Sequence, residues 1–126
     1  MKPRRVPLDD ARRARDVIDA IVRTRRAETE ALSAAFASNQ MHELHDFRIA
    51  CKRLRYAMER FSKRVPEFEA PAASLAAIQD ALGEAHDRDV LLAILPPTMP
   101  ETERALQEQR EELVRRAADI WASLPP

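Results

Sequence analysis

Hydrophobic residues recur along most of the chain at the three- and four-residue spacing of helices that bury one face. The spacing predicts helices over residues of about 9–38, 41–64, 72–95 and 101–124. No stretch shows the polar and apolar alternation of a strand. We therefore predict one all-α domain over residues 1–126, folded as an antiparallel four-helix bundle. The apolar stripes contain Ile18, Ile21 and Val22; Leu44, Phe47, Cys51, Leu54, Met58 and Phe61; Leu75, Ile78, Leu82 and Ala93; and Leu113, Ala117 and Trp121.

Helix-breaking and helix-capping residues support these boundaries. Asp9 or Asp10 could cap the first helix, and Asn39 marks the turn that follows it. Pro66 and Pro96 lie just beyond the predicted ends of the second and third helices. The only glycine, Gly83, falls inside the third helix, where it costs about 1 kcal/mol relative to alanine. We expect either a close approach by a neighbouring element or a local break there.

The net charge of zero hides an asymmetry between the two halves of the chain. Residues 1–64 carry 16 Lys and Arg against 9 acids, whereas residues 65–126 carry 5 against 12. The two halves could pair with each other across the bundle. Alternatively, the basic half could present its cations to a polyanion.

The predicted second helix gathers cations beside its apolar stripe. At about 100° per residue, His45, Arg48, Lys52 and Arg55 fall in one sector, and we expect Arg48 and Lys52 to face solvent. Arg53 points elsewhere. A row of forked guanidinium donors and a lysine suits a chain of phosphates better than a single small ligand.

Two segments of the sequence resemble a known family. HDFRIACKRLRYAMERF, from residue 45, and LAAIQDALGEAHDRDVLLAIL, from residue 75, are similar to the CHAD family, the conserved histidine α-helical domain. The resemblance covers about residues 42–95, and the last helix with Trp121 looks like the end of the second half of that domain. Members usually contain two similar helical halves around a basic groove that binds inorganic polyphosphate.

The resemblance implies the residues of a polyphosphate site. His45 matches the histidine of the family name, Arg48 follows it, and Lys52, Arg53 and Arg55 form the basic block. The second motif falls on Gly83, His86 and Asp87. From the residues alone, we expect the first helix to extend the track of cations through Arg12, Arg15, Arg23 and Arg26. Because one half is missing, we expect a homodimer or a second CHAD-like half as partner.

Several alternatives remain open at this stage. The basic helix could belong to a structural bundle that docks an acidic protein partner. Nucleic acid is a weaker candidate, since Tyr56 is the only aromatic residue near the cations. His42 and His45, with an acid or His86, could bind a metal, although the spacing matches no common metal motif. His86 could instead be an interior histidine bonded to its neighbours.

Catalysis finds little support in the sequence. We see no phosphate-binding glycine loop, activated nucleophile or paired metal carboxylates, so we expect a non-catalytic protein without a cofactor. Cys51 is expected to be a small core residue, and Arg25 to pair inside the bundle with a carboxylate such as Asp89. With no membrane span or secretory signal in view, we expect a cytoplasmic protein that is recruited to polyphosphate granules.

Overall fold

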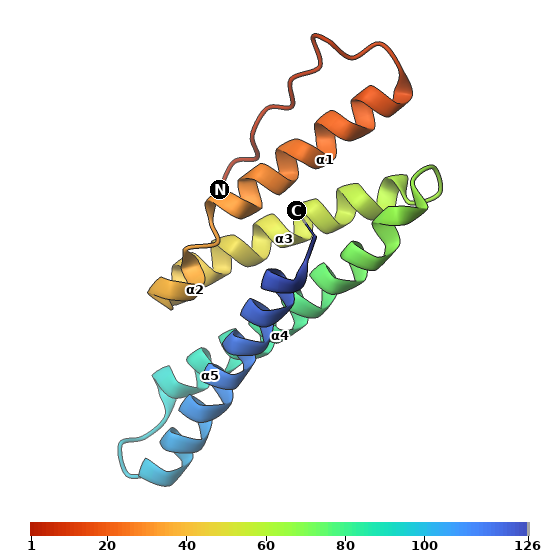
Figure 1. Cartoon of the computed structure of the whole chain (residues 1–126). Helices are drawn as coiled ribbons and strands as arrows, with labels where there is room; N and C mark the ends of the chain where they lie inside the picture. Colours follow the sequence, from red (N-terminus) through yellow and green to blue (C-terminus); the bar gives the residue numbers. More distant parts are fainter. Residues whose placement is uncertain (126) are drawn as a thin grey trace.

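The chain folds into four long helices, as Figure 1 shows for the computed structural model, in which residues 1–125 are described. The long helices are α1 (Ala14–Ala31), α3 (Met41–Phe61), α4 (Glu69–Ile94) and α5 (Pro100–Ser123). A four-residue helix, α2 (Ala35–Ser38), and a 3₁₀ turn, η1 (Pro66–Phe68), lie in the connections. Residues 1–125 contain no strand. The predicted all-α fold is confirmed.

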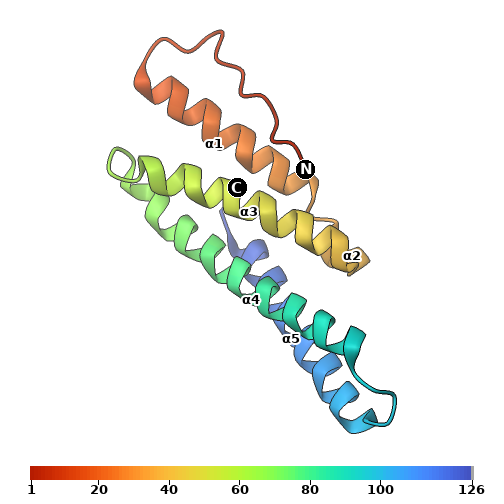
Figure 2. The same ribbon diagram turned by 180° about the vertical axis from the view of Figure 1, so that it is seen from behind.

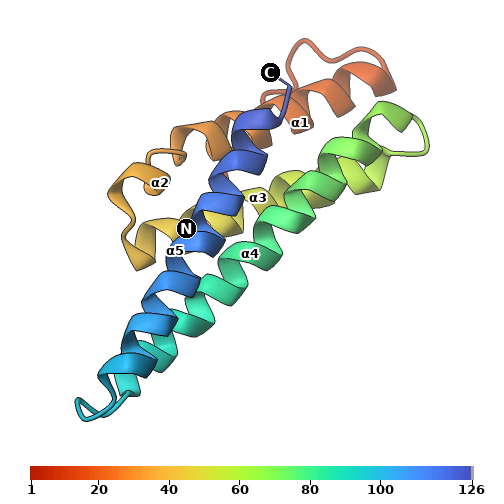
Figure 3. The same ribbon diagram turned by 60° about the horizontal axis from the view of Figure 1, so that its bottom comes forward.

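The long helices form an antiparallel bundle that is open on one side. Each long helix runs antiparallel to the one before it (Figures 1 and 2). α1 and α4 pack on two different sides of α3, and α5 packs along α4. Within residues 1–125, α3 is the only long helix against which the backbone of α1 packs. Figure 3 shows α5 crossing over the layer that α3 and α4 form.

The core lies between α3, α4 and the second half of α5. Phe47, Leu54 and Leu75 are almost completely buried, and the rings of Trp121 and Phe47 are perpendicular, with their centroids 5.2 Å apart. Most of the predicted apolar stripes are therefore confirmed as core. Ala93 is an exception, because α4 runs past the end of α3 and leaves this residue exposed.

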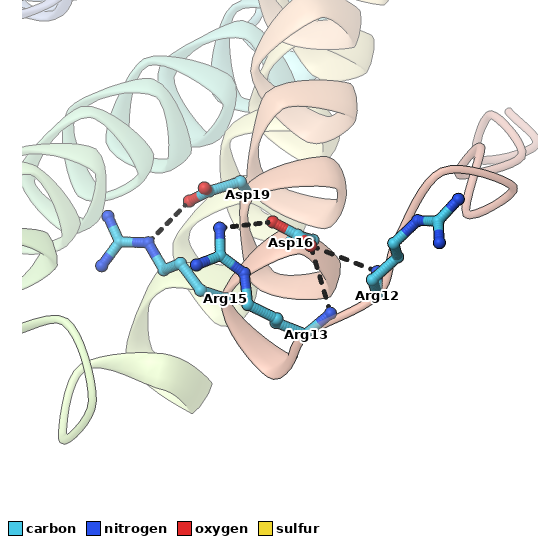
Figure 4. A network of polar contacts seen from close by, with 5 residues as sticks. All are labelled: Arg12, Arg13, Arg15, Asp16 and Asp19. Atoms are coloured by element: carbon cyan, nitrogen blue, oxygen red, sulfur yellow. Dashed lines mark hydrogen bonds and ion pairs between the residues drawn. The ribbon is translucent and has the colours of Figure 1, made fainter.

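The first helix begins at Ala14, five residues later than predicted, because a different acid caps it. Asp16, not Asp9 or Asp10, accepts hydrogen bonds from the main-chain N–H groups of Arg12 and Arg13, both at 3.1 Å (Figure 4). These donors lie just before the first turn and have no partner within the helix. The pKa of Asp16 is lowered, mainly by the bond from the Arg12 main chain.

The predicted first helix is also interrupted before Ser38. The Ser33 hydroxyl donates to the Glu30 carbonyl at 2.8 Å, which offers the backbone an alternative to continued helix. α2 then ends at Ser38, and the next residue, Asn39, adopts the left-handed conformation with φ 56°. Asparagine is one of the few residues that tolerate this conformation. The resulting corner turns the chain into α3.

Two further helix boundaries differ from the prediction by about one turn, and the remaining ones lie within one residue of it. α3 ends at Phe61, and α4 begins at Glu69 with Pro71 in its first turn. A proline is tolerated there because the missing N–H would have had no helical acceptor. The prediction had placed this proline in a loop.

A largely buried arginine on α5 connects three parts of the chain. Arg110 donates its Nε–H to Asp89 on α4, and its two other nitrogens donate to the side chain and carbonyl of Asn39, at 2.7 and 3.1 Å. The predicted pair between Arg25 and Asp89 is therefore wrong. α1 and α4 lie on different sides of α3, and Arg25 instead pairs with Glu28 on its own helix.

Candidate functional site

The two sides of α3 differ in chemistry. Phe47 points toward Trp121 of α5, whereas His45, Lys52 and Tyr56 are exposed. At about 100° per residue, these three exposed residues lie opposite the buried stripe. This outer face of α3 is on the side of the layer away from α5, which lies behind α4 in Figure 2.

A tyrosine ring lies close to two cations on this outer face. The Nζ of Lys52 is 5.7 Å from the centre of the Tyr56 ring, and the guanidinium carbon of Arg55 is 4.8 Å from it. Arg55 also forms an ion pair with Glu59 at 3.2 Å, although without hydrogen-bond geometry. Lys52 has no ion-pair partner among residues 1–125. Its charge is therefore available to a ligand.

Arg48 joins α3 to α4. The prediction that it faces solvent is therefore wrong. Its Nε–H donates to the main-chain carbonyl of Gln79 at 3.1 Å, and the side chain is half-buried. The guanidinium lies over Gly83, where an added Cβ would come within 3.1 Å of Nη2. α4 is continuous through Gly83, so the predicted close approach is confirmed and the local break is wrong.

The histidines of the two motifs meet across the α3–α4 seam. The ring centres of His45 and His86 are 6.2 Å apart, and both residues are exposed. His86 is thus not the interior histidine considered from the sequence. Both histidines line a small cleft, together with Arg48, Asp89 and four apolar side chains. In residues 1–125, no group of three or more His, Cys, Asp or Glu side chains has an arrangement that could hold a metal ion.

The packing of α3 on α4 brings together two segments that are distant in the sequence. Arg48 and Gln79, for example, are 31 residues apart. The segment with His45 and Arg48 and the segment with Gly83 and His86 form one surface. The CHAD domain family model matches residues 2–96. The chain belongs to the CHAD domain family. Comparison with curated proteins gave no match, and comparison with solved structures gave none either.

The match to the CHAD domain extends the resemblance toward the N-terminus, because it includes α1 and the segment before it. α5 lies beyond the matched residues. CHAD domains are known for polyphosphate binding at the level of the family. No helix within residues 1–125 combines the length and apolar character that a membrane span requires.

Ion pairs do not connect the basic half of this CHAD domain with its acidic half. Every ion pair within residues 1–125 joins two residues of the same half. Arg110 and Asp89, the pair that links two helices, both belong to the acidic half. The interpretation in which the halves neutralise each other through ion pairs is therefore wrong for this part of the chain.

The predicted arginines of the first helix are placed differently from the cations of α3. Arg12 precedes α1, whereas Arg15 pairs with Asp19 on α1 (Figure 4). Arg26 pairs with Glu30 on the same helix. Arg23 is exposed beside a cavity that four aspartates line, Asp9, Asp10, Asp16 and Asp19. Acids therefore accompany the side chains of Arg15, Arg23 and Arg26, whereas Lys52 has no ion-pair partner within residues 1–125.

Arg53 contacts the N-terminal segment. Its Nη2 donates to the carbonyl of Met1 at 2.7 Å, and the side chain is half-buried. No pattern in the sequence predicts this contact, which joins residues 52 positions apart. No pattern predicts the role of Glu28 either, a buried acid that accepts from the main-chain N–H of Arg4 at 2.6 Å.

Cys51 is a core residue, as expected. It is completely buried beneath the outer face of α3. Burial raises the pKa of its thiol from 9.0 to about 12, because the interior solvates a thiolate poorly. The reactive form is therefore suppressed at neutral pH.

Proposed function

We propose that this CHAD domain binds inorganic polyphosphate on the outer face of α3. Lys52 and His45 would contact phosphates directly, and Arg55 would join them by exchanging Glu59 for a phosphate. Arg48 would present the guanidinium nitrogens that the Gln79 carbonyl does not use. With a rise of about 1.5 Å per residue, Arg48 to Arg55 covers about 10 Å, enough for several phosphates.

The observation that carries this proposal is that, within residues 1–125, no ion pair joins the basic half to the acidic half. The cations of the outer face receive no carboxylate from the acidic half, although that half carries 12 acids. An extended polyanion could supply the missing negative charges at many points along the face. The family membership supports the same ligand.

We further propose that binding is non-catalytic and that it recruits the protein to polyphosphate granules in the cytoplasm. The outer face offers cations beside the ring of a tyrosine, which suits the binding of an anion. Cys51, the nucleophilic side chain nearest to this face in sequence, is buried with a raised pKa.

Calorimetric titration with long-chain polyphosphate at two salt concentrations tests the proposal. We expect tight binding that weakens as salt rises, by the counterion release known for nucleic acids. Orthophosphate and single-stranded DNA should compete poorly. Lys52→Glu should weaken binding at least tenfold. Arg115→Glu, on α5, is the matched control because its side chain is also exposed, at 63%.

The outcomes separate the alternatives. Equal losses in Lys52→Glu and Arg115→Glu would show that net charge matters and the outer face does not. If the wild-type protein gives no heat with polyphosphate at low salt, the proposal fails. Binding to an acidic protein would then favour the interaction bundle.

We also propose that two copies pair through the free end of the α4–α5 hairpin. Val90, Leu91, Ile94 and Met99 are exposed there, with Ile94 at 73%. The hairpin extends beyond α3 (Figure 1), and residues 90–100 include no charged side chain. A second copy would present the same uncharged apolar surface, so a two-fold pair could bury both without charge repulsion.

Light scattering of the protein as it elutes from a size-exclusion column would measure its mass and so show whether it is a dimer. We expect a dimer for the wild-type protein and a monomer for Ile94→Glu. Ala122→Glu, at an exposed position near the other end of α5, should leave the dimer intact. A wild-type monomer at high concentration would contradict this interface.

A further inference from the structure

The first residues of the chain form an extended segment that lies against the domain. Residues 1–13 contain no helix and run back along α1, antiparallel to it, so that the N-terminus lies beside the far end of α1 (Figures 1 and 2). We define residues 1–5 as the arm. It contains three cations, Lys2, Arg4 and Arg5, and all of its residues are exposed.

A buried ion pair fixes the register of the arm. Glu28 is only 5% exposed and accepts the main-chain N–H of Arg4, while Arg25 donates both to Glu28 and to the carbonyl of Arg4, the latter at 2.9 Å. Both main-chain groups of Arg4 are thus bonded to α1. Burying a charged pair is costly unless its hydrogen bonds are satisfied, and here the arm supplies two of those bonds.

The arm also reaches the basic helix. Met1 accepts a hydrogen bond from Arg53 of α3, three residues before the contact of Arg4 with α1. Three residues of extended chain span about 10 Å, so Lys2 lies between the two anchors. Arg53 directly follows Lys52, so the arm is bonded to the same turn of α3 that carries Lys52 and Tyr56.

The cations of the arm have no partners within the described chain. No carboxylate of residues 1–125 forms an ion pair with Lys2, Arg4 or Arg5. The main chain of the arm is therefore fixed by side chains, whereas its own side chains remain free. That arrangement suits a ligand-binding element and leaves the charges uncompensated in the absence of an anion.

We infer that the arm is a second part of the polyphosphate site. Lys2, Arg4 and Arg5 bind phosphates that extend past the outer face of α3, and Arg25 and Glu28 are positioning residues that hold the arm in place. This inference rests on the proposed function. It assigns the ligand a path from α3 onto the N-terminal segment.

The salt dependence of binding tests the inference. The variant K2Q/R4Q/R5Q removes three cations, and R104Q/R115Q/R116Q removes three exposed cations from α5 as a matched control. Each phosphate contact contributes about 0.7–0.9 to the slope of log K against log salt. We expect the arm variant to lose about two units of slope and about 100-fold in affinity at 0.1 M salt. The control should keep the wild-type slope.

The result separates this inference from the proposed function. If the wild-type protein binds and both triple variants keep the same slope, the arm is not part of the site. If the wild-type protein does not bind polyphosphate at all, the proposed function fails first. Circular dichroism of each variant checks that the helices are retained.

A protection experiment provides an independent readout. Trypsin cleaves after Arg4 and Arg5, and we expect polyphosphate to slow this cleavage in the wild-type protein at least tenfold. Orthophosphate at the same phosphate concentration should not. An unrelated trypsin substrate in the same tube controls for inhibition of the protease. If polyphosphate slows cleavage of the arm no more than it slows cleavage of the control substrate, the inference is overturned.

Discussion

The Nη2 atom of Arg48 lies 3.1 Å from the point that a Cβ on residue 83 would occupy, so the glycine of α4 and the arginine of α3 fit each other. The same arginine is bonded to the Gln79 carbonyl one turn earlier on α4. Glycine costs helix stability, and this contact is the local reason for keeping it. The pair is a direct contact between the two motifs of the CHAD domain.

A double-mutant cycle measures this fit. Gly83→Ala should raise the free energy of unfolding by about 1 kcal/mol in the Arg48→Ala background, because alanine is the better helix former. With Arg48 present, the guanidinium must move, and we expect most of this gain to be lost. Urea unfolding of the four proteins gives the coupling. An equal gain in both backgrounds would show that Arg48 adapts freely.

Arg110 is expected to be the most important charged residue for stability. Its side chain is 12% exposed and that of Asp89 is 16% exposed. Arg110→Ala leaves the carboxylate without its cation and frees Asn39, so we expect a loss of about 3–5 kcal/mol in the free energy of unfolding.

Arg115→Ala is the control for Arg110→Ala. Arg115 pairs with Glu112 at the surface, with both side chains more than half exposed, and its loss should cost less than about 1 kcal/mol. Urea unfolding measures both variants. Equal losses would mean that the Arg110 network contributes no more than a surface pair.

Cys51 should make the unfolding free energy depend on pH in the alkaline range. The pKa of the thiol rises from 9.0 to about 12 on folding. Between these values the unfolded chain loses the proton and the folded chain keeps it, so stability is lost as pH rises from about 9 to 12. Cys51→Ala should remove this part of the pH dependence. If the two curves remain parallel, the thiol titrates equally in both states.

Asp16 should control the start of α1 at acidic pH. Its pKa is lowered because it accepts hydrogen bonds from the Arg12 and Arg13 main chains. The stabilisation is complete above the ordinary value of 3.8 and is lost as pH falls through the lowered pKa. Asp16→Asn should therefore speed amide exchange of Arg12 and Arg13 at pH 5. Asp19→Asn, which affects only the pair with Arg15, should not.

The helices could be predicted because each has a repeating apolar stripe, and the bundle follows from burying four such stripes. The boundaries were less accurate. Asp16 caps α1 through main-chain groups that precede it, and a rule that looks for the acid before the helix selects Asp9 instead. The break before α2 depends on a serine bond and on the conformation of Asn39, which periodicity does not report.

The site was predicted in part. Helical spacing placed His45 and Lys52 on one exposed face, since that depends on α3 alone. It could not show that Arg48 bonds to α4 or that Arg53 contacts Met1, because these contacts depend on how distant segments pack. Arg25 was recognised as needing a carboxylate, but its partner Glu28 is three residues away and not on another helix.

The one-sided packing of α1 has a consequence for the dynamics of the protein. Among the long helices, α1 has its backbone neighbour only in α3, whereas α3 and α4 each have two. A helix with one neighbour can open while the rest remains folded, so its amides should exchange with deuterium before those of α3 and α4. An anion held by both the arm and α3 would close this opening route. Ligand and local order would then be coupled.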